Sequence, residues 1–344
     1  MGNSKSRIKL ATALVVVASL TIGVVAALSL SGATKHKPKP KPKAINLSGV
    51  TLNVGDIFGA AQVLFNDSGA LKGAQYKVNF TTFSLGPPDI AAIQGGAIDL
   101  TVTADTPAIF AQAGGVPLKV VAVTQPVVPG DWLGIVVLKG SSITSLAQLK
   151  GQKIAAASGT IMQYLAIQAL NGSIGSYNNA TLVNLFPSLA LSALTSGSVQ
   201  AAVLVQPFLA DAVSSGARVI TLGTPYTKGY SYYLAANAAL ADAKKTAAIA
   251  DYLRRVGVAQ HWAATHLSTW AQDYSSAYNI STSLAAAAVD SELASFVKIG
   301  APEYNSLKNE GAAFQAAGLL TTPVNTGTLF STQFNSIVSS FLKG

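Results

Sequence analysis

The 344-residue sequence contains no cysteine, and its only histidines are His36, His261 and His266. Without cysteine there is no thiolate nucleophile, no structural disulfide, and no attachment point for the lipid of a lipoprotein. No G-x-S-x-G turn is present, no P-loop lysine follows the glycines, and no cluster has metal-ligand spacing. These absences predict a protein that is not an enzyme and that holds neither a metal nor a cofactor.

Charged residues are also scarce outside the N-terminus. Residues 1–43 hold eight of the 23 lysines and arginines and no acid, which leaves 15 basic against 14 acidic residues in the remainder. The formal net charge of +9 is therefore a property of the N-terminal segment. A nearly neutral remainder lacks the electrostatic footprint of nucleic-acid binding, which we do not expect.

The N-terminus has the pattern of an export segment. Lys5, Arg7 and Lys9 precede an uncharged apolar run over residues 10–30, and small residues follow up to Ala33. This pattern predicts a signal peptide over residues 1–33, and the run is also long enough to be a retained membrane anchor. Residues 34–43 include HKPKPKPK, which predicts an extended linker, with a patch that binds anionic lipid as the alternative.

Residues 76–123 carry the clearest periodicity. Short alternating segments, read as strands, are each followed by a turn and an apolar helical segment, which predicts a parallel sheet. One helix begins at Gly86-Pro87-Pro88 and ends at Gly95-Gly96; the next begins at Thr106-Pro107 and ends at Gly114-Gly115. Proline suits a first helical turn and glycine a left-handed cap. Because both helix starts face the same sheet edge, their unpaired N–H groups predict an anion site.

The same stretch resembles the solute-binding proteins of ABC importers for aliphatic sulfonates, with nitrate and taurine binders as relatives. The likeness rests on Phe83, Gly86 and Pro87, and on the segment from Gly96 to Pro107 with Ile98, Asp99, Thr103, Asp105 and Thr106. It continues through residues 146–160 and 194–208. The resemblance implies an α/β fold of two doubly wound lobes joined by a two-strand hinge, the type II periplasmic-binding fold. Lobe one would comprise residues 44–124 and 229–344, and lobe two residues 125–228.

The second half of the chain fits that division. Strands and helices alternate from residue 133 to residue 222, and Ala-rich helices follow from residue 239 to the end. Ser158-Gly159-Thr160 follows one predicted strand and opens a helix, either as plain capping or as a second anion-binding turn. We expect Trp262 and Trp270 to be core anchors.

The resemblance also implies a set of ligand-binding residues. The Ser158 turn would face the turns at Gly86 and Thr106 across an interlobe cleft. Phe58 lies either in the pocket wall or in the core, and Asp105 either caps its helix or orients Thr106. Gln206 stands where the family often has an aspartate, which favours a ligand with an anionic head and an uncharged tail. The complete predicted set is Phe58, Phe83, Gly86, Pro87, Asp105, Thr106, Ser158, Gly159, Thr160 and Gln206.

The function that the resemblance implies is capture of a small organic anion outside the cytoplasm, with an aliphatic sulfonate as the preferred ligand. A membrane permease would be the partner, and we expect a monomer. Nitrate, bicarbonate or a thiamine-precursor-like heterocycle are alternative ligands. An enzyme on the same two-lobed fold is the remaining alternative.

Overall fold

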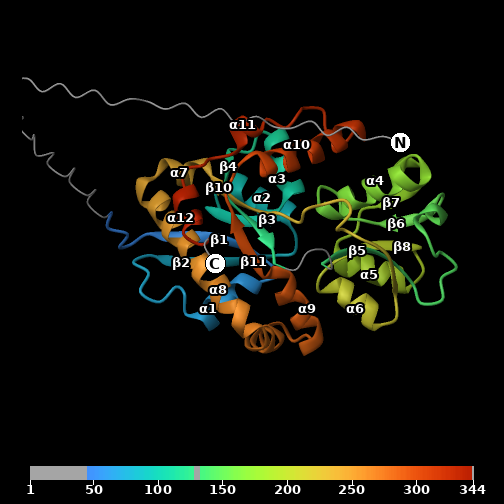
Figure 1. Cartoon of the computed structure of the whole chain (residues 1–344), viewed down its shortest axis with the longest axis horizontal. Helices are drawn as coiled ribbons and strands as arrows, with labels where there is room; N and C mark the ends of the chain where they lie inside the picture. Colours follow the sequence, from blue (N-terminus) through green and yellow to red (C-terminus); the bar gives the residue numbers. More distant parts are fainter. Residues whose placement is uncertain (1–44, 128–131, 343–344) are drawn as a thin grey trace, which may run out of the picture. The chain divides into compact units, whose positions relative to one another are not determined.

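The computed structural model describes residues 45–127 and 132–342. They form an α/β fold with two sheets (Figure 1). The first sheet contains β1 (Thr51–Ile57), β2 (Lys77–Phe83), β3 (Leu100–Ala104), β4 (Leu118–Pro126), β10 (Ser231–Ala236) and β11 (Ala294–Val297). The second contains β5 (Leu133–Val137), β6 (Lys153–Ala155), β7 (Thr181–Val183), β8 (Ala201–Val205) and β9 (Arg218–Leu222).

Helices from three parts of the chain surround these sheets. Those before the second sheet are α1 (Ala60–Ser68), α2 (Gly86–Gln94) and α3 (Asp105–Ala113). Those within its sequence are α4 (Ile161–Ile174), α5 (Pro187–Thr195) and α6 (Phe208–Ser214), with the 3₁₀ turns η1 (Leu146–Leu149) and η2 (Tyr177–Asn179). Those after it are α7 (Asn237–Ala241), α8 (Ala243–Tyr278), α9 (Thr282–Glu292), α10 (Ala301–Ala316), α11 (Thr326–Leu329) and α12 (Asn335–Ser339).

In the first sheet, β1 pairs in parallel with both β2 and β3. The strand order is β11-β4-β10-β3-β1-β2, and β10 is antiparallel to both of its neighbours. Helices α2 and α3 directly follow β2 and β3, as the sequence predicts, so they begin at the same edge of the sheet. The second glycine of each predicted pair, Gly96 and Gly115, has a φ of 71°, which confirms the left-handed helix ends.

The second sheet has the order β7-β6-β8-β5-β9, and its central strands β8 and β5 are buried on both faces. Ile135 and Val203 pack into one hydrophobic cluster with α4, whereas Val136 and Leu204 pack into another with α5 and α6. Successive strand residues point to opposite faces, so these apolar runs need helices on both sides. Figure 1 shows α4 on one side of this sheet and α5 and α6 on the other.

The C-terminal region departs from the prediction at one element. Residues 239–344 were expected to be helical, but Ala294–Val297 forms β11, which pairs antiparallel with β4 at the edge of the first sheet. Four residues are too few for a period-two pattern to stand out beside an Ala-rich helix. As predicted, Trp270 is fully buried in the core, where it also forms part of a cavity wall, and the less buried Trp262 packs against the same core.

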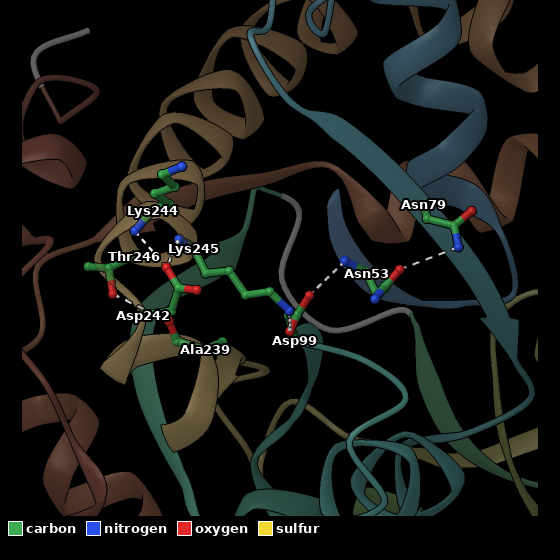
Figure 2. A network of polar contacts seen from close by, with 8 residues as sticks. All are labelled: Asn53, Asn79, Asp99, Ala239, Asp242, Lys244, Lys245 and Thr246. Atoms are coloured by element: carbon green, nitrogen blue, oxygen red, sulfur yellow. Dashed lines mark hydrogen bonds and ion pairs between the residues drawn. The ribbon is translucent and has the colours of Figure 1, made fainter. Parts of the chain in front are cut away.

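Asp99, one of the motif residues behind the family resemblance, is the centre of a polar network (Figure 2). Its carboxylate accepts a 2.9 Å hydrogen bond from the backbone N–H of Asn53 and forms a 2.6 Å ion pair with Nζ of Lys245. Asp242 caps α8 by accepting from the N–H groups of Lys244 and Lys245. The network therefore joins the strand β1, the turn before β3 and the start of α8, and Asp99 has a structural role.

The predicted signal or anchor over residues 1–33 and the linker over residues 34–43 lie outside the described residues. Within residues 45–127 and 132–342, no helix combines the length and the apolar character needed to cross a bilayer.

Candidate functional site

A cavity of about 170 Å³ is lined by residues of both sheets and their helices. The first sheet and its helices contribute Asp56, Phe58, Gly86, Thr103, Tyr233, Trp270 and Glu292 among others. The second sheet and α4 contribute Thr160, Ile161, Met162, Val205 and Gln206, and Trp132 precedes β5. Pockets for drug-sized ligands commonly measure about 300–1,000 Å³, so this cavity fits a small solute.

The turn that opens α2 reaches the cavity through Gly86. A side chain at this position is excluded, because a Cβ would lie 2.3 Å from Oγ1 of Thr103 and 2.5 Å from Cγ of Pro107. Pro87 and Pro88 follow in the first turn of the helix, where the missing N–H groups cost nothing. The backbone of Gly86 is therefore held closely against β3 and α3, with its N–H at a helix start.

The turn that opens α4 reaches the cavity through Thr160. Its hydroxyl donates to the carbonyl of Ala157 at 2.6 Å and accepts from the N–H of Met162 at 3.2 Å. This confirms the capping role considered for Thr160. Capping commits the hydroxyl, so the groups left for a ligand are backbone N–H groups of the helix start.

Four such N–H groups have no acceptor within residues 45–127 and 132–342: those of Leu85, Gly86, Thr160 and Ile161. All four residues line the cavity. By contrast, the N–H of Ser158 donates to Asn184 at 2.9 Å and that of Gly159 to Gln163 at 2.8 Å. Unpaired N–H groups at helix starts carry partial positive charge and suit an anion.

The two turns are neighbours although they belong to different sheets. A Cβ built on Gly159, which has a φ of 69°, would lie 3.8 Å from Cγ of Pro87. A second contact between the sheets comes from Phe58 and Phe208, whose ring centroids are 5.8 Å apart in an edge-on arrangement. Phe58 both lines the cavity and packs against the second sheet's core, so it combines the two roles that the sequence left open.

Gln206 also lines the cavity, at the end of β8. Its side-chain oxygen accepts from the N–H of Ala210 at 3.0 Å, which holds the amide against the first turn of α6. Of the predicted residues, the structure thus brings together Phe58, Gly86, Thr160 and Gln206 around one cavity. The remainder do not line it: Phe83, Pro87, Asp105, Thr106, Ser158 and Gly159.

Thr106 and Asp105 require a correction to their predicted placement at the cavity. The hydroxyl of Thr106 donates to the carboxylate of Glu310 on α10, and Asp105 accepts from the N–H of Thr106 at 3.1 Å. All three side chains are buried, and burial raises the pKa of both Asp105 and Glu310. This polar cluster fastens α10 to the start of α3, and its side chains are not available to a ligand in the cavity.

Two acids that the sequence analysis did not select do line the cavity, Asp56 and Glu292. Asp56 accepts hydrogen bonds from the N–H groups of Ala61 at 3.2 Å and Gln62 at 2.8 Å at the start of α1. Burial nevertheless raises its pKa to about 6. Glu292 is an exposed residue of the cavity wall; desolvation by the neighbouring protein, with the charge of Asp56, raises its pKa to about 7.

The lining includes no lysine, arginine or histidine. An anion in this cavity would therefore be held by backbone dipoles and neutral side chains. No group of side chains in the described part of the chain has the arrangement of a metal site.

Comparisons with known proteins bear on this geometry. Residues 87–255 match a family described as NMT1/THI5 like. A protein named as an aliphatic sulfonates-binding protein from Escherichia coli (strain K12) is 34% identical over 161 residues. A protein of the same name from Bacillus subtilis (strain 168) is 28% identical over 159 residues. The alignments cover 46% and 45% of this chain, and 50% and 47% of the relatives, so the chain matches about half the length of these proteins.

Solved structures extend the likeness over more of the chain. The periplasmic aliphatic sulphonate binding protein SsuA from Escherichia coli matches with a TM-score of 0.72 and 25% identity, covering 82% of this chain and 92% of that one. SsuA from Xanthomonas axonopodis pv. citri, solved bound to MOPS, matches with a TM-score of 0.74 and 22% identity, covering 83% and 99%. The desulfurization enzyme DSZB shares the fold at 14% identity and a TM-score of 0.63 over 86% of this chain and 100% of its own. The predicted fold is confirmed.

Proposed function

We propose that this chain, a relative of the aliphatic sulfonate-binding proteins with the type II periplasmic-binding fold, is the solute-binding component of an ABC importer. Its ligand is a small organic anion, with an aliphatic sulfonate as the preferred class. The observation that carries the proposal is that Gly86, Thr160 and Ile161, from two helix starts, line one cavity and have N–H groups without an acceptor among the described residues. Each such donor contributes about 1 kcal/mol or more toward a charged acceptor.

The rest of the assignment follows from this role. The protein acts outside the cytoplasm, as a monomer, and delivers its solute to a membrane permease. Residues 44–124 and 229–344 form one lobe and residues 125–228 the other. The crossings between them act as a hinge, and closure around the solute creates the surface that the permease recognises.

Alternative ligands are nitrate, bicarbonate and a thiamine-precursor-like heterocycle. The cavity lining argues against catalysis, since it offers no histidine, and the chain has no cysteine. The enzyme alternative rests on the fold it shares with DSZB at 14% identity. We therefore favour binding without turnover.

The test is isothermal titration calorimetry of the purified chain with a panel of small anions. The panel contains methanesulfonate, ethanesulfonate, hexanesulfonate, taurine, nitrate and bicarbonate, and thermal unfolding is measured with each. Short alkanesulfonates should bind and raise the melting temperature by mass action, and the small cavity should disfavour the six-carbon chain. Binding of nitrate or bicarbonate without any sulfonate would replace the ligand class, and loss of a sulfonate's sulfur during incubation would establish an enzyme.

A further inference from the structure

Glu292 is the last residue of α9 and lies in the wall of the cavity with Gln260, Ser291 and Ala294. Its backbone carbonyl accepts from Nε2 of Gln260 at 3.1 Å. Its carboxylate, in contrast, makes no hydrogen bond to any residue in 45–127 or 132–342. The carboxylate therefore has no partner among the described residues, and it belongs to an exposed residue in the wall of the cavity where the solute is proposed to bind.

The charges around Glu292 do not compensate for its own. Asp56, from the end of β1, is the ionisable group whose charge acts on it, and the phenols of Tyr233 and Tyr274 lie close enough to sense Glu292. The lining provides no cationic side chain. Asp56 already has two backbone N–H donors, so Glu292 is the acid whose protonation state remains open to a ligand.

An anion that enters this cavity meets a carboxylate of the same charge, and a low local dielectric strengthens the repulsion. Protonation of the carboxyl removes the repulsion and adds an O–H donor to the backbone N–H groups and neutral side chains of the lining. We propose that Glu292 binds the anionic solute in its protonated form, as a hydrogen-bond donor, so that capture of the anion takes up one proton from the solvent. This inference rests on the proposed function.

The direction of the pH effect follows from the raised pKa of Glu292, about 7 without solute. A bound anion raises it further, because the charged form of the acid is disfavoured beside a like charge. Below about pH 6 Glu292 is already protonated, so it should contribute no further change in affinity; a change there would come from Asp56, whose pKa is about 6. Above about pH 7 each unit of pH should weaken binding by up to about tenfold, since one proton is taken up.

The experiment is calorimetric titration with ethanesulfonate, which stays ionised throughout, at about pH 5.5, 7 and 8.5. Each titration is repeated in two buffers that differ in ionisation enthalpy, which gives the number of protons taken up directly and needs no variant. The wild type should bind about tenfold or more weakly at pH 8.5 than at pH 7, with uptake approaching one proton at pH 8.5. Glu292→Gln should bind with nearly the same affinity at pH 7 and pH 8.5, since the amide retains a donor without the charge and Asp56, with a pKa of about 6, is mostly ionised at both.

Asp290→Asn is the matched control, because Asp290 is an exposed acid on the same helix and does not line the cavity. It should reproduce the wild-type pH profile. A wild-type affinity that is independent of pH, or that rises with pH, would overturn the inference, as would an unchanged pH profile in Glu292→Gln. If no anion of the panel binds at any pH, the proposed function itself fails, and the two failures are thereby distinguished.

Discussion

The hydroxyl of Thr106 donates a hydrogen bond to the carboxylate of Glu310, a residue 204 positions later in the chain. This contact fastens α10 to the start of α3 and turns a motif threonine away from the cavity. Replacing Thr106 by valine removes a buried donor and leaves Glu310 with Asp105 as its remaining hydrogen-bond partner. We expect the free energy of unfolding to fall by about 1–3 kcal/mol, as measured by urea denaturation.

The same variant should keep its affinity for ethanesulfonate in calorimetric titration at a temperature where it remains folded. Thr195→Val provides the control, because Thr195 is an exposed threonine of α5 and such changes have small effects. If Thr106→Val had normal stability but no longer bound ethanesulfonate, the Thr106 side chain would have to be part of the ligand site.

Asp89 gives a pH-dependent stability prediction. Its side chain is fully buried in α2; one oxygen accepts from Thr101 at 2.6 Å and the other has no partner, and burial raises its pKa to about 7. A raised pKa in the folded state contributes stability that is present below the unfolded value of 3.8 and is lost as the pH rises through about 7. We expect Asp89 alone to lower the unfolding free energy on the order of 2–4 kcal/mol between pH 4 and pH 8.

Asp89→Asn should therefore be more stable than the wild type at pH 8 and show a shallower dependence of stability on pH, because the amide cannot ionise. Urea denaturation at several pH values measures this, with Asp290→Asn as an exposed acid for comparison. The explanation fails if Asp89→Asn loses the same amount of stability at both ends of the pH range.

Gly86 and Gly96 separate the two reasons for which a glycine is required. Gly86→Ala would place a Cβ against Thr103 and Pro107, so the turn must shift, at an expected 1–3 kcal/mol, about the range for overpacking. In Gly96→Ala the new Cβ contacts no other atom, but the φ of 71° is unfavourable for alanine, so we expect a loss of stability of about 1–2 kcal/mol. Calorimetric titration should show weakened ethanesulfonate binding for Gly86→Ala and normal binding for Gly96→Ala. Equal affinities would mean that the N–H of Gly86 does not hold the anion.

Thr160 should respond differently to alanine and to serine. Alanine removes the cap of α4, which we expect to lower stability by about 1 kcal/mol and to weaken anion binding by loosening the turn that carries the N–H groups of Thr160 and Ile161. Serine keeps the hydroxyl that bonds Ala157 and Met162, so it should restore both properties. Thermal unfolding and calorimetric titration of the two variants provide the check. Loss of binding in the serine variant would point to the methyl group instead of the cap.

Local sequence signals predicted most of the secondary structure, because prolines and glycines mark the starts and ends of α2 and α3, and apolar runs mark the buried strands. They could not predict that β10 would insert antiparallel between β3 and β4, since pairing between distant strands has no local signature. β11 was missed for the same reason and because it has only four residues.

Site residues could be predicted where a turn between a strand and a helix marks them in the sequence. They could not be predicted where tertiary packing determines whether a side chain reaches the cavity. Gly86 and Thr160 follow strands and open helices, and both line the cavity. Thr106 also opens a helix, but its partner Glu310 is visible only in the folded chain. Glu292 ends an Ala-rich helix, and no sequence motif surrounds it. The one indication of another group that helps to bind the anion was that the predicted anion-binding turns contain no lysine or arginine.

The connectivity of the first sheet has a consequence for the order in which the molecule assembles. β4 lies between β10 and β11, which the ribosome makes more than a hundred residues later, whereas the second sheet comes from the unbroken interval 133–222. During synthesis from the N-terminus, all strands of the second sheet can therefore pair before the partner strands of β4 have been made. The half of the protein that begins the chain is the last to be finished.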